Sequence, residues 1–235
     1  EIGVRLVGSE MCIRDSYYAN RVIPMLPKEL SNGICSLNPQ EDRLAFSCLC
    51  ELDKQGNITD YKFAKTVIRS RVKGVYSEIN SLLAGSDDAE LKEKYADVSG
   101  QLPIIKELAD ILYKNKKNRG CPELETSESK LIINDEDICV GVERRTRGRS
   151  EEIIEDFMLV ANECAARFGM DNNLPFVYRI HEEPSDEKLE SLREALVKLN
   201  VQYKLGEKAC PGDMSEILKA AKGTDIDLIM NNIVL

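Results

Sequence analysis

Basic side chains, which can bind phosphate groups, are concentrated in three clusters of this acidic chain. The clusters consist of Lys62, Lys65, Arg69, Arg71 and Lys73; of Lys114, Lys116, Lys117 and Arg119; and of Arg144, Arg145, Arg147 and Arg149. The net charge of −9 argues against a protein that coats nucleic acid non-specifically, because such binding requires a locally high density of Lys and Arg. Each cluster alone is typical of a solvated surface. Folding could also bring the clusters together along one channel, with the acidic excess outside it.

Carboxylate pairs are the candidate ligands for a hard metal ion such as Mg²⁺. Three pairs occur: Asp87 with Asp88, Asp135 with Asp137, and Asp225 with Asp227. All of them lie in expected turns or helix starts, where Asp is favoured because it bonds to nearby backbone N–H groups. We therefore interpret these pairs as turn and cap residues and assign no metal ligand within the chain.

Cysteine and histidine usage indicates neither a zinc site nor a disulfide framework. The chain has eight cysteines, no C-x-x-C pair and one histidine, His181. A chain of 235 residues with 43% apolar content can form a core without covalent cross-links. The sequence therefore predicts buried thiols that pack as small hydrophobic groups.

The chain lacks the sequence features of membrane insertion or export. No run approaches about 18 consecutive apolar residues, and no basic region followed by an apolar block begins the sequence. We expect a cytoplasmic protein without a membrane partner, and nothing in the sequence indicates an obligate protein partner.

Hydrophobic periodicity predicts an α+β chain with antiparallel hairpins. Strands are expected over 44–52 and 58–68, joined by a turn at 54–57, over 129–133 and 138–145, joined across 134–137, and over 176–180. Helices are expected over 75–83, 89–117, 186–199 and 214–221, and Ser99, Gly100 and Pro103 should break the second of them. A further helix should begin with Ser150 as its N-cap and end near Gly169.

Five separated segments are distinctive, and the first has turn residues and apolar anchors too particular for a generic loop. They are RVIPMLPKELSNGICSLNPQEDR (21–43), TVIRSRVKGVY (66–76), the tract ending KKNRG (116–120), EEIIEDFMLVANECAA (151–166) and LPFVYRIHEEPSDEKL (174–189). In this order they resemble the catalytic domain of the ribonuclease R and ribonuclease II (RNB) exoribonuclease family. The resemblance covers residues 17–235. It implies an RNB fold in which a mixed sheet with antiparallel hairpins, surrounded by helices, encloses a narrow RNA channel.

The family resemblance also implies RNA-binding roles for four residues: Tyr17, Tyr76, Glu155 and Arg119. Tyr17 falls where the family places an aromatic residue that clamps the terminal nucleotides, although a half-buried tyrosine is the alternative from the residue alone. Such stacking suits a nuclease without sequence preference, because every base has a π face. Leu124 occupies the expected place of the partner aromatic residue, and Glu155 could instead be a solvated acid favoured by the helix dipole.

The same resemblance places the family's catalytic chemistry outside this chain. The family hydrolyses phosphodiesters with Mg²⁺ held by an aspartate cluster, which is expected upstream of the first matching segment, and with an arginine, which is expected beyond Leu235. We therefore expect residues 17–235 to be the central part of the catalytic domain, truncated at both ends and inactive by themselves. Residues 1–16, EIGVRLVGSEMCIRDS, do not resemble the family and are interpreted as a foreign, adapter-derived segment.

Three functions remain open from the sequence. The preferred one is a fragment of a processive, Mg²⁺-dependent 3′-to-5′ exoribonuclease that degrades RNA to nucleoside monophosphates and to which this chain contributes channel and clamp residues. The second is a catalytically inactive RNA-binding protein derived from the RNB fold. The third is a structural interaction domain unrelated to RNA, which would require the five matching segments to be coincidental.

Overall fold

The computed structural model describes residues 15–17, 21–123, 128–145, 147–180, 182–206 and 208–234. Within these ranges the chain forms two compact units. The first contains the residues up to Ile111 together with Glu128–Pro175, and the second contains Leu112–Ser127 and Phe176–Leu235. Residues 1–14 of the segment interpreted as foreign lie outside the described part, as do Leu124 and His181.

The longest hairpin of the first unit pairs β3 (Asp42–Leu52) with β4 (Ile58–Arg69) in antiparallel register. Its turn is held by Asp53, whose Oδ1 accepts hydrogen bonds from the backbone N–H groups of Gln55 and Asn57 at 2.9 and 2.8 Å. Gly56 adopts a φ of 80°, a conformation that glycine reaches without steric cost. The hairpin predicted from alternation and turn residues is confirmed.

Two shorter hairpins and a π-helix complete the strand-rich part of this unit. β1 (Asp15–Tyr17) pairs with β2 (Val22–Pro24), and β5 (Glu128–Ile133) pairs with β6 (Cys139–Arg145). Within the first matching segment, a π-helix spans Glu29–Ile34. The α+β class and the antiparallel hairpins are confirmed, and the described strands form three separate pairs and not one larger mixed sheet.

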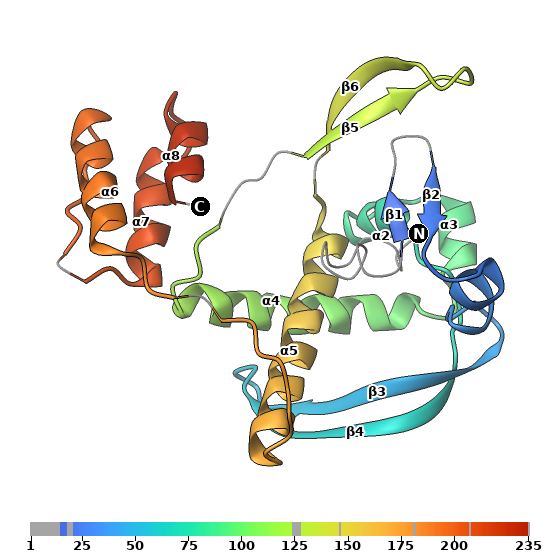
Figure 1. Cartoon of the computed structure of the whole chain (residues 1–235). Helices are drawn as coiled ribbons and strands as arrows, with labels where there is room; N and C mark the ends of the chain where they lie inside the picture. The colour runs from blue at the N-terminus through green and yellow to red at the C-terminus, as the bar shows by residue number, and fades with distance from the viewer. Residues whose placement is uncertain are drawn as a thin grey trace. The chain divides into compact units, whose positions relative to one another are not determined.

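Helices α2 (Tyr76–Leu83), α3 (Ala89–Lys94) and α5 (Arg149–Asp171) belong to the first unit. The predicted break after α3 is confirmed, because a 3-10 turn over Ser99–Gln101 precedes α4 (Leu102–Asn118). In Figure 1 the β3–β4 hairpin lies across the carboxyl end of α5, and α2 lies near its amino end. α5 is thus the element that connects these two parts of the unit.

The second unit is a helical cluster of α6 (Asp186–Lys198), α7 (Pro211–Ala221) and α8 (Asp227–Val234). Its core is formed by apolar residues spaced by three or four along these helices, with Leu205 from a connecting segment. The buried members are Leu189, Leu192, Leu196, Leu205, Ile217, Ala221 and Met230. Their burial removes apolar surface from water and stabilises the cluster.

In the aspartate pairs, four residues have a local structural role as a helix cap, an ion-pair partner, a turn residue or a hydrogen-bond acceptor at a helix start. Asp88 caps α3 by accepting from the N–H groups of Glu90 and Leu91, and Asp87 pairs with Lys92 at 2.7 Å. Asp137 has a φ of 61° in the β5–β6 turn. Asp227 accepts a bond from Gly223 N at 2.9 Å, as expected of a residue at a helix start.

Several details predicted from the sequence are wrong. Phe176–Ile180 has no strand structure, because apolar alternation alone does not provide a pairing partner. Gly148, and not Ser150, is the N-cap of α5, which continues to Asp171. Of the described cysteines only Cys164 is fully buried, whereas Cys35, Cys121, Cys139 and Cys210 are exposed, because they lie in turns, edges and irregular segments rather than on a core-facing side.

Candidate functional site

Three hydrogen bonds join α2 and the first turn of α5 into one junction. The Ser150 hydroxyl donates to the backbone carbonyl of Tyr76 at 3.1 Å. Asn80 accepts from the Ser150 N–H at 2.8 Å and donates to the Glu151 carboxylate at 3.0 Å. Ser150 is almost fully buried, so these bonds satisfy polar groups that water does not reach. The junction therefore fixes the amino ends of the two helices against each other.

A side chain at Gly148 would occupy the space of the Asn80 amide. A Cβ atom built on Gly148 would approach Asn80 Cγ to 2.5 Å and Oδ1 to 2.7 Å. The backbone φ of −108° is accessible to any residue, so the requirement for glycine here is steric and not conformational. This N-cap position thus depends on a residue that the hydrophobic pattern does not specify.

The Glu151 carboxylate is the electrostatic centre of the junction. Besides Asn80, the Gly148 N–H donates to it at 3.1 Å, and the Ser150 hydroxyl, also 3.1 Å away, shares its single proton between this carboxylate and the Tyr76 carbonyl. Burial opposes ionisation of Glu151, but these hydrogen bonds outweigh burial and hold its pKa below the usual value. A carboxylate at this end of a helix also interacts favourably with the helix dipole.

An open cleft of about 610 Å³ beside the junction carries three cationic side chains. Lys106 of α4, Arg147 and Arg149 line it, while Glu151 is the acid in its lining. Arg149 also binds Asp110 at 2.5 Å and Glu152 at 2.8 Å, and Arg147 lies 3.5 Å from Glu155. The cleft therefore has an excess of positive charge in its lining, with carboxylates that orient two of the three cations.

The residues assigned from the family resemblance are distributed over both units. Tyr76 is the first residue of α2 and is half-buried, and Glu155 is exposed on α5, where Arg147 pairs with it. Arg119 is exposed after α4 in the second unit. Tyr17 pairs with Val22 through the backbone of β1. The structure thus places Tyr76 and Glu155 on the two helices of one junction, together with the third basic cluster.

The basic clusters differ in their placement. The third cluster leads from β6 into α5. The first begins on β4, which packs near the carboxyl end of α5, and its last members precede α2. The second belongs to the other unit. The single channel that would unite all three clusters therefore remains a prediction.

Sequence reasoning missed three contributors to the junction, Asn80, Gly148 and Glu151. The spacing of Gly148 and Glu151 matches that of a capping box with glycine at the cap, and this signal could have placed the helix start correctly. Asn80 left no comparable signal, because its partners follow about 70 residues later in the sequence.

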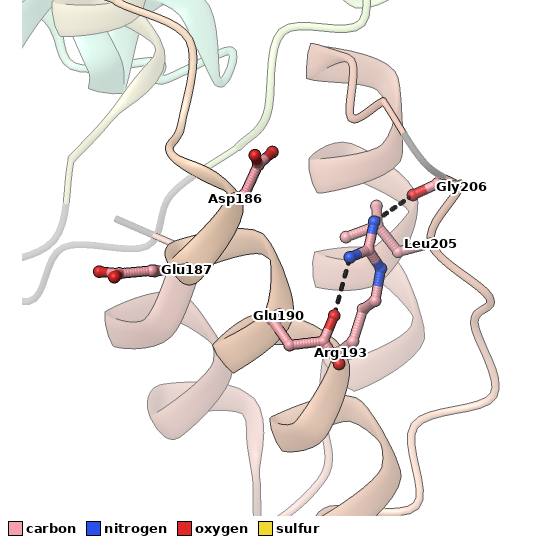
Figure 2. Close-up of a pocket in the computed structure, with 6 residues that line it drawn as sticks. All are labelled: Asp186, Glu187, Glu190, Arg193, Leu205 and Gly206. Atoms are coloured by element: carbon pink, nitrogen blue, oxygen red, sulfur yellow. Dashed lines mark hydrogen bonds and ion pairs between the residues drawn. The ribbon is translucent and has the colours of Figure 1, made fainter.

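A second open cleft, in the helical unit, has the opposite character. Figure 2 shows Asp186, Glu187 and Glu190 at its wall, with Arg193 the basic residue among those that line it. Arg193 binds Glu190 at 2.9 Å and the Gly206 carbonyl at 2.7 Å. Because three carboxylates outnumber one engaged cation, this cleft repels phosphate and is unsuited to a polyanion.

The cationic cleft is equipped to hold a polyanion. Its side chains offer charge-assisted hydrogen-bond donors, which suit phosphate oxygens. Among the described residues, no group of three or more His, Cys, Asp and Glu could hold a metal ion. In the same part of the chain, no helix is long and apolar enough to cross a membrane.

The fold is that of the RNB domain, whose family model matches residues 15–235. The chain belongs to this family. Similar relatives are ribonuclease R 1 of Lactococcus lactis, 36% identical over 93% of this chain and 27% of its own length, and ribonuclease R of Escherichia coli, 37% identical over 87% and 25%. The chain thus spans about a quarter of the length of these relatives.

A solved structure, RNase R of Mycoplasma genitalium, resembles the chain with a TM-score of 0.85 and 27% sequence identity. The match covers 94% of this chain and 34% of the apo form of that protein. The same protein has been solved in complex with ribose-methylated single-stranded RNA and with double-stranded RNA. The α+β RNB fold expected from the five segments is therefore confirmed.

Proposed function

We propose that this chain is the channel and clamp portion of a processive 3′-to-5′ exoribonuclease of the ribonuclease R type, which hydrolyses RNA to nucleoside monophosphates. The observation that carries the proposal is the similarity to ribonuclease R over 93% of the chain. RNA is the proposed partner, in line with the RNA complexes of the Mycoplasma protein. We place the parent enzyme in the cytoplasm.

The described residues contribute RNA contacts to this activity. Lys106, Arg147 and Arg149 would hold backbone phosphates in the cationic cleft, where their attraction does not depend on base sequence. Tyr17 would stack on a terminal base, and Tyr76, Glu155 and Arg119 would contact the RNA as the family resemblance implies. Holding by charge and stacking allows the strand to advance, because neither interaction selects a particular base.

Hydrolysis itself is assigned to residues outside this sequence. Among the residues that the structure describes, no group of three or more His, Cys, Asp and Glu could hold a metal ion. We propose that Mg²⁺ is bound by the family's aspartate cluster elsewhere in the parent protein, and that the 235 residues alone bind RNA without degrading it.

A chimera tests the proposal directly. Residues 17–235 would replace the matching segment of Lactococcus lactis ribonuclease R 1, and 5′-labelled single-stranded RNA would be followed by gel electrophoresis with Mg²⁺ or with a chelator. We expect shortening from the 3′ end and release of nucleoside monophosphates only with Mg²⁺. The isolated chain should leave the same RNA intact.

Site variants distinguish specific contacts from general effects. In the chimera, Tyr76→Ala and Glu155→Gln should slow degradation or change the end products, whereas Lys198→Ala on an exposed face of α6 should not. A chimera that folds and binds RNA but never shortens it would contradict the enzyme and favour the inactive RNA-binding protein. Absence of both binding and cleavage in a folded chimera would overturn both RNA functions.

A further inference from the structure

Three cysteines meet where the β3–β4 hairpin packs on α5. Cys48 and Cys50 are two residues apart on β3 and so lie on one face of the hairpin. Cys164 of α5 is fully buried against this face, with its sulfur 3.7 Å from that of Cys50. Cys50 is only partly buried, so it is the more exposed residue of the pair.

Contacts on the same side of α5 hold the two sulfurs together. Phe168, one turn after Cys164, packs edge-on against Phe63 with ring centroids 5.5 Å apart. Asp171, nearly another turn along, accepts a hydrogen bond from the Tyr61 hydroxyl at 3.0 Å. Tyr61 and Phe63 are paired across the hairpin with Cys50 and Cys48. The two thiols therefore lie close together because a helix and a hairpin pack against each other, and neither thiol is on a loop.

We propose that Cys50 and Cys164 are an oxidation site for hydroperoxides, at which Cys50 reacts first and Cys164 then closes a disulfide between β3 and α5. This is a modification of the chain that its RNA chemistry does not require. It is independent of the proposed nuclease function, because neither thiol lies among the residues assigned to RNA.

The two steps balance as follows for hydrogen peroxide. The Cys50 sulfur attacks one peroxide oxygen, the O–O bond breaks, and Cys50 becomes a sulfenic acid while one water is released. The Cys164 sulfur then attacks the Cys50 sulfur, the S–O bond breaks, and the departing hydroxide takes the Cys164 proton as a second water. Two thiols are oxidised to one disulfide and one peroxide is reduced to two waters.

The geometry and the chemistry of the two thiols suit this order. A disulfide has a sulfur–sulfur distance of about 2.05 Å, so the two sulfurs, 3.7 Å apart, must approach by about 1.7 Å. Burial, with a contribution from Cys50, raises the pKa of Cys164 to about 12. Cys164 is therefore a poor first nucleophile, whereas its position 3.7 Å from the Cys50 sulfur suits it to the second step.

Mass spectrometry of the full 235-residue chain tests the proposal. The chain would be treated with hydrogen peroxide, quenched with catalase, alkylated and digested without reductant. We expect a Cys50–Cys164 linked peptide that dithiothreitol removes, and a rise in Tm of roughly 10 °C, because the bond closes a long loop of the unfolded chain. Cys50→Ser should abolish both effects, and the matched variant Cys48→Ser should keep them.

The resolving role of Cys164 has its own readout. In Cys164→Ala, dimedone should trap a persistent sulfenic acid at Cys50. Should this core variant fail to fold, Cys50→Ser and Cys48→Ser still decide the matter, because both alter partly exposed positions. A peptide linking Cys48 to Cys164, or oxidation of Cys50 no faster than that of the exposed Cys121, would overturn the proposal.

Discussion

The α2–α5 junction predicts that Gly148→Ala and Asn80→Ala are strongly coupled. Asn80→Ala removes the acceptor of the buried Ser150 N–H, at a cost of about 1–3 kcal/mol, and one donor to the Glu151 carboxylate, at about 1 kcal/mol. Gly148→Ala places a methyl group in the space of the Asn80 amide and should expel it. Each single variant should therefore lose about 2–4 kcal/mol of stability.

The double variant separates this explanation from a general effect of glycine. With alanine at position 80 the amide that clashes is absent, and the backbone of Gly148 accommodates a side chain. The double variant should then be no less stable than Asn80→Ala alone, which gives a coupling energy of about 2 kcal/mol or more. Urea unfolding followed by far-UV circular dichroism measures all four proteins. Additive losses would refute the steric argument.

Three further predictions follow from other contacts. Glu78→Gln should destabilise the chain near pH 7 but not in acid. Hydrogen bonds from Lys94 and Tyr95 hold the pKa of Glu78 below its usual value of 4.5. The stability that ionised Glu78 contributes is therefore present above pH 4.5 and is lost as the pH falls through the lower pKa of the folded state. Urea titrations at both pH values check this, and an equal loss at each would contradict it. Gly120→Ala should lower the free energy of unfolding by about 2–4 kcal/mol, because φ at Gly120 is 79° and a Cβ would lie 2.7 Å from the Gly212 backbone nitrogen. Urea unfolding measures this loss, and an unchanged denaturation midpoint would count against the prediction. Arg147→Ala should weaken RNA binding and lower the slope of log affinity against log salt by about 0.7, measured by fluorescence anisotropy, whereas Lys198→Ala should leave the slope unchanged; equal slopes for the two variants would argue against a phosphate contact at Arg147.

The sequence alone determined the secondary-structure elements that depend on short sequence patterns. Alternation flanking a Gly-containing turn at 54–57 and a polar turn at 134–137 predicted both long hairpins. Apolar spacing of three and four predicted α2, α3, α4 and α6. The five family segments predicted the RNB fold over almost the whole chain. These features depend on residues close together in sequence or on an extended pattern of types, so they can be read without coordinates.

Tertiary structure decided the features that depend on partners distant in sequence. Glycine is required at position 148 because the Asn80 amide occupies the space of a side chain, and Asp110 orients Arg149 through an ion pair. Cys50 and Cys164 come together because the β3–β4 hairpin packs on α5. Apolar alternation at 176–180 did not produce a strand, because a strand requires a neighbour with which to share hydrogen bonds. Local pattern specifies which backbone a segment prefers, whereas burial and side-chain contact arise only when segments meet in space.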